Sequence, residues 1–232
     1  MNKCVKTAEL FSCEIPYLRD FFSAHEYPWQ MLPEIKELAK KLVSEGIEGF
    51  TEIKAGVLVG KGVKIHESAV IEPPAVIGHG CEVRVGAYIR GNVITGENCV
   101  IGNSSELKNC ILLSRVQVPH YNYVGDSVLG NRAHMGAGSI CSNLKSDKSN
   151  VAVKGDEIYE TGLRKFGAIL GDGADIGCGS VLNPGTVIGR ESSVYPLTSV
   201  RGVIPCGCIV KSSSEIVVRR NSDKEENRQC AE

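Results

Sequence analysis

Residues 168–200 have the sequence AILGDGADIGCGSVLNPGTVIGRESSVYPLTSV, in which an aliphatic side chain recurs at every sixth position. A small or β-branched residue lies two positions before each of them, as Ala168 precedes Leu170. The same period extends from Val59 to Leu113, where Thr95 is the one departure from an aliphatic side chain. No α-helix has this phase, and alternation between position i and position i−2 is typical of a strand. The aliphatic positions of the later run are Leu170, Ile176, Leu182, Ile188, Val194 and Val200.

This period predicts a parallel β-helix, in which three hexads close one triangular coil of about 18 residues. Glycine follows several of the aliphatic residues, as in Ile101-Gly102, where it relieves crowding at a corner. The repeat resembles that of hexapeptide-repeat proteins, and this resemblance implies a left-handed coil. The expected fold class is all-β: a single-stranded left-handed parallel β-helix with a short α-helical N-terminal segment.

Composition excludes several classes of protein. The chain has 232 residues and a net charge of −1, which favours neither nucleic acid nor an anionic membrane as a partner. The N-terminal sequence MNKCVKTAELFSCE lacks the apolar core of a signal peptide, and no run of residues is long and apolar enough to span a membrane. We therefore expect a cytoplasmic protein. Its ten cysteines include no CxxC pair, which favours reduced, structural thiols.

The repeat divides the chain into three parts. Residues 1–50 form a helical or linker segment, with an amphipathic helix expected from Pro33 to Gly46 that covers the open end or the side of the prism. Residues 51–210 form the β-helix. It is interrupted by a protruding loop at 142–166, in which Val151–Val153 and Ile158–Tyr159 are expected to form a hairpin. Residues 211–232 form a charged C-terminal tail.

A prism filled with aliphatic side chains has no internal pocket, so a functional site is expected where the repeat is broken. The largest break is QVPHYNYVGD, residues 117–126, and the phase slips between Leu113 and Val124. This segment, with GNSSELK at 102–108 and MGAGSICSN at 135–143, closely resembles the C-terminal acetyltransferase domain of bifunctional glucosamine-1-phosphate N-acetyltransferase/N-acetylglucosamine-1-phosphate uridylyltransferases. The tails of archaeal sugar-1-phosphate nucleotidyltransferases are similar too.

The resemblance implies roles for individual residues. His120 would be the general base that removes a proton from the attacking amine. Tyr123 and Asn143 would orient the amino sugar and complete the catalytic set. Arg90 and Lys108 would bind the sugar phosphate through charge-assisted hydrogen bonds. Each of these residues also has a plain structural interpretation, as a solvated surface group or a group that satisfies a turn.

In two places the sequence departs from the family pattern. Where the bacterial enzymes have an Asn, this chain has Ala133-His134, and His134 takes the sugar-contacting position, which leaves the choice of amino sugar open. The family lysine of the protruding loop corresponds to Lys148 or to its neighbour Lys145, and we name Lys148.

The resemblance also implies acetyl-CoA as co-substrate, bound in a groove between adjacent prisms of a homotrimer. The backbone N–H of Ala137 would then donate to the thioester oxygen. Cys178 and Pro196 would lie along the pantetheine. A Cys at that position also suggests an acyl-enzyme, although a small residue that fills a corner accounts for it more simply.

The function predicted is acetyl transfer to glucosamine 1-phosphate or a close amino-sugar phosphate, in the pathway to UDP-N-acetylglucosamine, without a metal. Two alternatives belong to other classes. One is a non-catalytic assembly or regulatory module that partners a separate sugar-1-phosphate nucleotidyltransferase, since no nucleotide-binding loop is found in this chain. The other is a metal-dependent hexapeptide enzyme, which would need three converging His among the five present.

Overall fold

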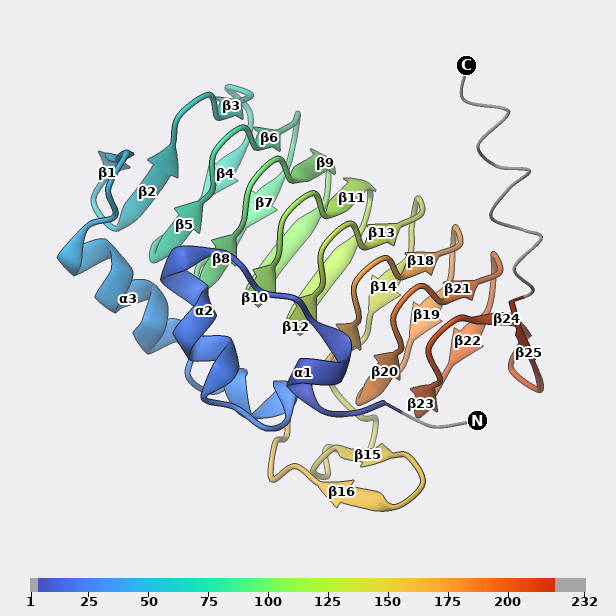
Figure 1. Cartoon of the computed structure of the whole chain (residues 1–232). Coiled ribbons are helices and arrows are strands. Elements are labelled where there is room, and N and C mark those ends of the chain that lie inside the picture. Colours follow the sequence, from blue (N-terminus) through green and yellow to red (C-terminus); the bar gives the residue numbers. More distant parts are fainter. Residues whose placement is uncertain (1–3, 220–232) are drawn as a thin grey trace.

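The chain forms a prism of stacked coils with helices packed along one side (Figure 1). The structure, a computed structural model, describes residues 4–219. Within that range, all but three of the strand pairings are parallel, and each strand pairs with its equivalent one coil away. The predicted parallel β-helix is confirmed. The prism has three faces, which we call the helix-covered face, the second face and the third face.

The strands of each face follow one another along the prism. The helix-covered face contains β2 (Val57–Gly60), β5 (Ala75–Ile77), β8 (Val93–Thr95), β17 (Ala168–Leu170), β20 (Thr186–Ile188) and β23 (Val203–Ile204). The second face contains β3 (Lys64–Ile65), β6 (Glu82–Val83), β9 (Val100–Asn103), β11 (Gln117–His120), β13 (His134–Met135), β18 (Asp175–Ile176), β21 (Ser193–Val194) and β24 (Cys208–Ser212). The third face contains β4 (Val70–Ile71), β7 (Tyr88–Ile89), β14 (Ile140–Cys141), β19 (Val181–Leu182) and β22 (Ser199–Val200).

Two longer strands, β10 (Glu106–Leu112) and β12 (Tyr123–Leu129), run around the edge from the third face to the helix-covered face. They shorten the coil. In the first coils Lys64 pairs with Glu82. Between the two long strands Glu106 pairs with Tyr123, and these two residues are one position closer in sequence than Lys64 and Glu82. The middle coils are therefore shorter than the first ones, and the phase of the repeat slips within them.

This shorter coil corrects one expectation. The sequence placed Leu113 inside the prism, but Leu112 belongs to the interior cluster and Leu113 packs in the cluster under the helices. Because both clusters are apolar, adjacent leucines at this edge look alike in sequence. The slip begins between Leu107 and Leu112, earlier than predicted.

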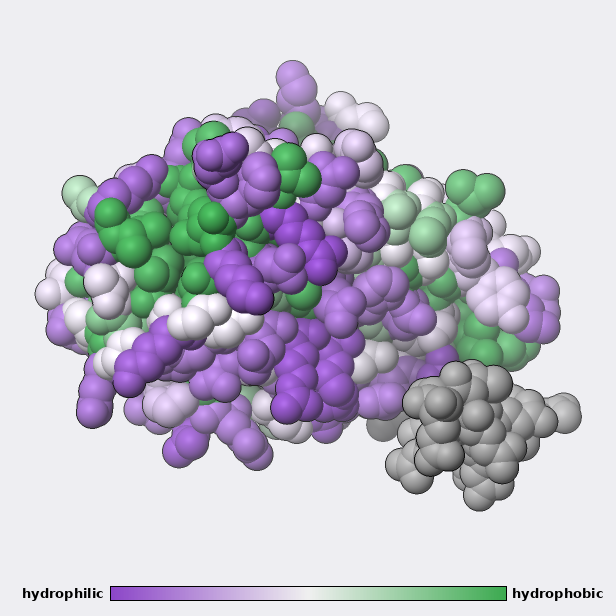
Figure 2. Space-filling model, turned by 90° about the horizontal axis from the view of Figure 1, so that it is seen from above, coloured by the Kyte–Doolittle hydropathy of each residue, from purple (hydrophilic) through white to green (hydrophobic). Residues whose placement is uncertain are grey.

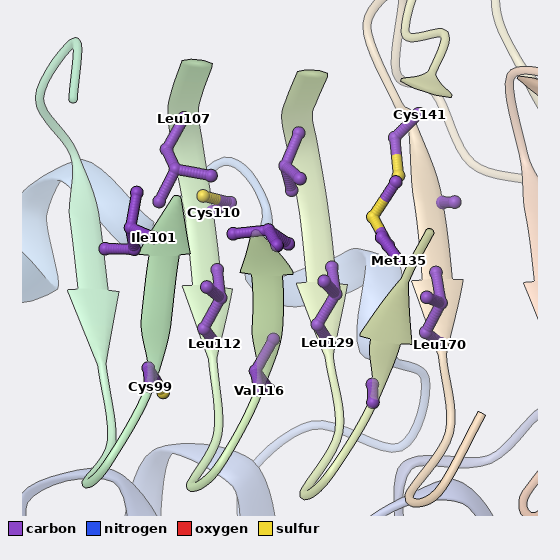
Figure 3. Packing of buried hydrophobic residues seen from close by; sticks show 14 of the residues in the cluster. Cys99, Ile101, Leu107, Cys110, Leu112, Val116, Leu129, Met135, Cys141 and Leu170 are labelled. Carbon is purple, nitrogen blue, oxygen red and sulfur yellow. The ribbon is translucent and has the colours of Figure 1, made fainter. Parts of the chain in front are cut away.

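The interior is packed with aliphatic side chains and sulfur, as Figure 3 shows for residues that point toward one another between successive strands. Cys99, Cys110 and Cys141 are fully buried there as free thiols. Glycine is required at one close approach in particular. A Cβ at Gly102 would overlap the carbonyl oxygen of Pro119, so no other residue fits that corner.

The N-terminal segment contains α1 (Thr7–Leu10), α2 (Pro16–Ser23), η1 (Pro28–Met31) and α3 (Ile35–Glu45), which lie along the helix-covered face (Figure 1). The predicted helix is present as α3, and Gly46 with φ 74° ends it. Outward side chains of the face, such as Ile94 and Ile169, are fully buried under these helices. Each fully buried aliphatic side chain of this kind contributes about 1.5–3 kcal/mol. Of the two positions expected for the helical segment, it therefore occupies the side of the prism.

The two ends of the prism differ. At the first coil, Ile65 is 37% exposed and Val70 50% exposed. Figure 2 shows hydrophobic residues gathered over this end, at the left. There, β1 (Phe50–Lys54) pairs antiparallel with β2 on one face only. At the other end, β24 pairs antiparallel with β25 (Glu215–Val218), which closes that sheet edge. The expected tail at 211–232 is thus a hairpin strand as far as Val218, and residues 220–232 lie outside the described residues.

The protruding loop leaves the edge between the third and helix-covered faces. Cys141 pairs with Leu182, although the loop lies between them in the chain, so the loop is an insertion between two adjacent coils. Its hairpin of β15 (Ala152–Lys154) and β16 (Ile158–Glu160) is close to the prediction. Tyr159 packs against Tyr27 and Trp29 of the same chain, with ring centroids at 5.4 and 5.6 Å. The hairpin is therefore docked on its own subunit, and residues 146–150 form a continuous exposed stretch of the loop.

Candidate functional site

Most of the predicted site residues lie along the two edges that border the third face. We call the edge between the second and third faces the His120 edge, and the edge between the third and helix-covered faces the Asp126 edge. Tyr123 begins β12 on the third face between them.

The His120 edge aligns four predicted residues on successive coils. The carbonyl of His120 accepts the N–H of Gly138, and the carbonyl of Ala137 accepts the N–H of Gly179. In the next coil the carbonyl of Cys178 accepts the N–H of Leu197. His120, Ala137, Cys178 and Pro196 thus occupy equivalent corners, and all four are exposed. They follow one another along the edge in this order, and the roles expected for them stay predictions.

Buried Asn122 holds the corner at His120. Its Oδ1 accepts the N–H of His120 at 3.0 Å, and its Nδ2 donates to the carbonyl of Gly136 at 2.8 Å. The intervening Tyr121 has φ 52° and is 64% exposed. This arrangement turns His120 outward, and its imidazole has no hydrogen-bond partner among residues 4–219. An imidazole in this state can accept a proton from a ligand.

The Asp126 edge carries a second group of polar side chains. Asn143 Nδ2 donates to Tyr123 Oη at 3.2 Å and to Asp126 Oδ2 at 2.5 Å. The ammonium of Lys108 lies 3.5 Å from the same carboxylate oxygen, and Asn109 Nδ2 donates to the other oxygen at 3.0 Å. Three of the predicted residues, Lys108, Tyr123 and Asn143, therefore form one network.

The phenol of Tyr123 stays protonated in this environment. Burial raises its pKa, and the carboxylates of Asp126 and Glu106 raise it further. A Cβ at Gly125 would lie 2.5 Å from Tyr123 Oη and 2.8 Å from Asn143 Nδ2, so a glycine is needed for the two side chains to meet. The pair can thus offer neutral hydrogen-bonding groups to a ligand.

Arg90 lies beside Lys108 on the preceding coil, because its N–H donates to the carbonyl of Leu107 at 2.8 Å. Its guanidinium donates to Glu106 Oε1 at 2.6 Å, and this contact raises the pKa of Arg90 further. Two cations on adjacent coils suit an anion such as a phosphate. The phosphate would have to share Arg90 with Glu106.

Two predicted residues lie apart from this network within the chain. His134 is on the second face, where its Nδ1 is 2.8 Å from Asp175 Oδ1 and holds the pKa of that carboxyl below its usual range. Lys148 is exposed in the protruding loop, with φ 58°. Its neighbour Lys145 is paired with Asp147 at 3.6 Å.

The sequence analysis did not identify Asn109, Asp126 or Asn122 as site residues. It also did not predict that Asn143 and Asn109 both donate to Asp126. A signal was present: Asn109, Asp126 and Asn143 recur at a constant interval, which is the length of the shortened middle coils. Within residues 4–219, no three His, Cys, Asp or Glu side chains converge in the manner of a metal site. None of the helices in that range has the length and apolar character needed to cross a membrane.

Known proteins are similar to this chain along most of its length. A profile described as the GMPPB C-terminal domain matches residues 81–161. The GlmU bifunctional protein of Methanococcus vannielii is 30% identical over 96% of this chain and 54% of its own length, in its C-terminal half. The bifunctional sugar-1-phosphate nucleotidylyltransferase/acetyltransferase of Sulfurisphaera tokodaii is 33% identical over 73% of this chain and 43% of its own length.

The chain spans about half the length of these bifunctional relatives. A shorter relative matches over more of its own length: the putative uncharacterized acetyltransferase YaiX of Escherichia coli is 32% identical over 67% of this chain and 68% of itself. With the hexapeptide coils and the polar network in place, these similarities show that the chain belongs to the GlmU-related family of hexapeptide-repeat acetyltransferases.

Proposed function

We propose that the chain transfers acetyl from acetyl-CoA to the amine of glucosamine 1-phosphate or a closely related amino-sugar phosphate. The observation that carries the proposal is the exposed His120 imidazole, without a partner in the described chain, one coil from Ala137 and on the same coil as Tyr123. The relative from Sulfurisphaera tokodaii is named as both a sugar-1-phosphate nucleotidylyltransferase and an acetyltransferase, and this combination supports the substrate class.

In the proposed reaction, the amine nitrogen attacks the thioester carbonyl carbon and His120 accepts the proton that the amine loses. The C–S bond then breaks, coenzyme A leaves as thiolate, and the proton on His120 can pass to it. The N–H of Ala137 donates to no acceptor within residues 4–219, so it is available to stabilise the oxyanion. General base catalysis of this kind contributes roughly 10²–10⁴-fold.

Arg90 and Lys108 would bind the phosphate, and Tyr123 with Asn143 would orient the sugar ring. The two groups of residues border one face, so a sugar anchored at the Asp126 edge would point its amine across the face toward His120. The acetyl-CoA would lie along the His120 edge, past Cys178 and Pro196.

We propose a homotrimer as the active unit. An exposed edge of one prism cannot enclose a cofactor, and Leu197, at the corner next to Pro196, is 85% exposed. A neighbouring prism would complete the groove and supply His134 or Lys148, which lie apart from the network in their own chain. A separate nucleotidyltransferase partner and a cytoplasmic location stay predictions.

The test is turnover of acetyl-CoA with glucosamine 1-phosphate, glucosamine 6-phosphate, galactosamine 1-phosphate and free glucosamine. Loss of the thioester absorbance is the suitable signal, because thiol reagents would also react with exposed Cys178. His120→Ala should lose about 100-fold or more in kcat. The matched control is His66→Ala, at an exposed corner of the first coil. Absence of turnover with every amine would contradict the proposal and favour the non-catalytic assembly module. Equal turnover by the native chain and the His120 variant would instead contradict the role of His120 as the base.

A further inference from the structure

Asp126 occupies the centre of the network beneath the proposed sugar site, and it is 6% exposed. Its Oδ2 accepts from Asn143 and faces the ammonium of Lys108, while its Oδ1 accepts from Asn109. A carboxylate can only accept hydrogen bonds, so every neighbour must present a donor to it. A buried carboxylate with three donors around it constrains the direction of each of them.

The backbone fixes the position of that carboxylate. Asp126 has φ 48°, a conformation that Asp tolerates better than most residues, and its carbonyl accepts the N–H of Gly167 at 2.8 Å. Gly167 is where the protruding loop returns to the prism. On the other side, Asn109 Nδ2 also donates to the carbonyl of Leu32, between η1 and α3, at 3.1 Å. The carboxylate is therefore tied to both the loop and the N-terminal helices.

These contacts decide which way the Asn143 amide faces. Its NH₂ group donates to Asp126 and to Tyr123 Oη, so its Oδ1 is turned away from them and has no partner among residues 4–219. Tyr123 Oη is occupied as an acceptor, so its own O–H remains free to donate. The pair thus presents one acceptor and one donor side by side.

We propose that Asp126 is a positioning residue that orients the Asn143 amide, so that Asn143 Oδ1 accepts from the amino sugar and Tyr123 O–H donates to it. This inference rests on the proposed function. An asparagine at 126 would offer one acceptor and one donor to two neighbouring NH₂ groups, so one contact must be lost or one amide must turn over.

The test compares Asp126→Asn with Asp172→Asn. Asp172 is also 6% exposed and accepts from Ser12, Asn131 and Arg190, but it lies between the helix-covered and second faces. In Asp126→Asn, KM for the amino sugar should rise about tenfold or more, with KM for acetyl-CoA unchanged within about twofold. Asp172→Asn should lower the melting temperature and leave both KM values unchanged.

A second measurement does not depend on activity. Titration of the tyrosines by ultraviolet absorbance, with Tyr123→Phe subtracted, gives the midpoint of Tyr123. Loss of the Asp126 charge should lower the pKa of Tyr123, because that carboxylate contributes to raising it. An unchanged midpoint together with an unchanged KM for the amino sugar would overturn the inference. No turnover by the native chain would instead contradict the proposed function, and the titration would still decide whether Asp126 acts on the pair.

Discussion

The Oδ1 of Asn122 accepts the backbone N–H of His120 at 3.0 Å, and the same side chain donates to Gly136 on the next coil. One buried amide therefore connects the coil that carries the proposed base with the coil that carries the proposed oxyanion donor. We therefore expect Asn122 to set the position of His120 relative to Ala137 without contacting a substrate itself.

Replacing Asn122 by Ala should disturb both coils. The change leaves the N–H of His120 and the carbonyl of Gly136 without this partner, which costs about 1–3 kcal/mol in stability. We expect kcat to fall while KM for the amino sugar changes little, since Tyr123 and Asn143 are not touched. Urea denaturation and steady-state kinetics measure the two effects. A stable variant with native kcat would show that this amide does not set the position of His120.

Replacing Gly125 by Ala should separate Tyr123 from Asn143. The added Cβ would lie 2.5 Å from Tyr123 Oη, so the phenol has to move. Because Gly125 does not need a positive φ, the backbone itself tolerates alanine. We expect KM for the amino sugar to rise about tenfold. A crystal structure of the variant with the Tyr123–Asn143 contact intact would contradict this explanation.

Stability should fall at alkaline pH because of Tyr17. Its O–H donates to the carbonyl of Thr95 at 2.8 Å, and burial raises the pKa of Tyr17 well above the ordinary value of 10.0. Above pH 10 the unfolded chain releases this proton and the folded chain keeps it, so the unfolded state binds fewer protons and stability decreases as pH rises. Urea denaturation at pH 8 and pH 11 measures the loss. Tyr17→Phe should be less stable than the native chain at pH 8 and should lose less stability between pH 8 and pH 11. An equal loss of stability in both proteins would mean that other groups cause the pH dependence.

Replacing Trp29 by Ala should release the protruding hairpin. Trp29 is 4% exposed and packs against Tyr159 and Phe166, so the variant loses about 3–5 kcal/mol. We expect protease cleavage within residues 144–160 well below the melting temperature. Ile158→Ala, at a position 66% exposed on the same hairpin, is the control and should be cleaved like the native chain. Equal resistance of all three proteins would mean that the loop is held in another way.

The sequence predicted the interior of the prism well, because inward positions recur at a fixed period and are almost all aliphatic. It failed at Leu113, where apolar residues lie on both sides of the helix-covered face, so periodicity alone cannot distinguish inside from outside. The hairpin was predicted from a turn between two β-branched segments, but its docking on Trp29 depends on a long-range contact that no local pattern encodes.

For the site, the resemblance led to His120, Tyr123 and Asn143, and the structure places the last two in contact. It did not lead to Asp126, because a short polar residue at a corner is ordinary in any coil. The importance of Asp126 comes from what surrounds it: Asn109 on one coil and Asn143 on the next. Such a stack is visible only when the coil is known to be shortened at this point.

The shortened length of the middle coils limits which mutations this chain can accept in evolution. Substitutions within the interior alter packing at one level of the prism and leave the vertical alignment of the coils intact. Insertion or deletion of a single residue between Gly91 and Asp126 would instead rotate every later side chain relative to the earlier ones and separate Lys108 from its partners. The site is thus specified by a count of residues as much as by their identities, and we expect relatives to vary freely in the aliphatic residue chosen while they keep the lengths of these few turns.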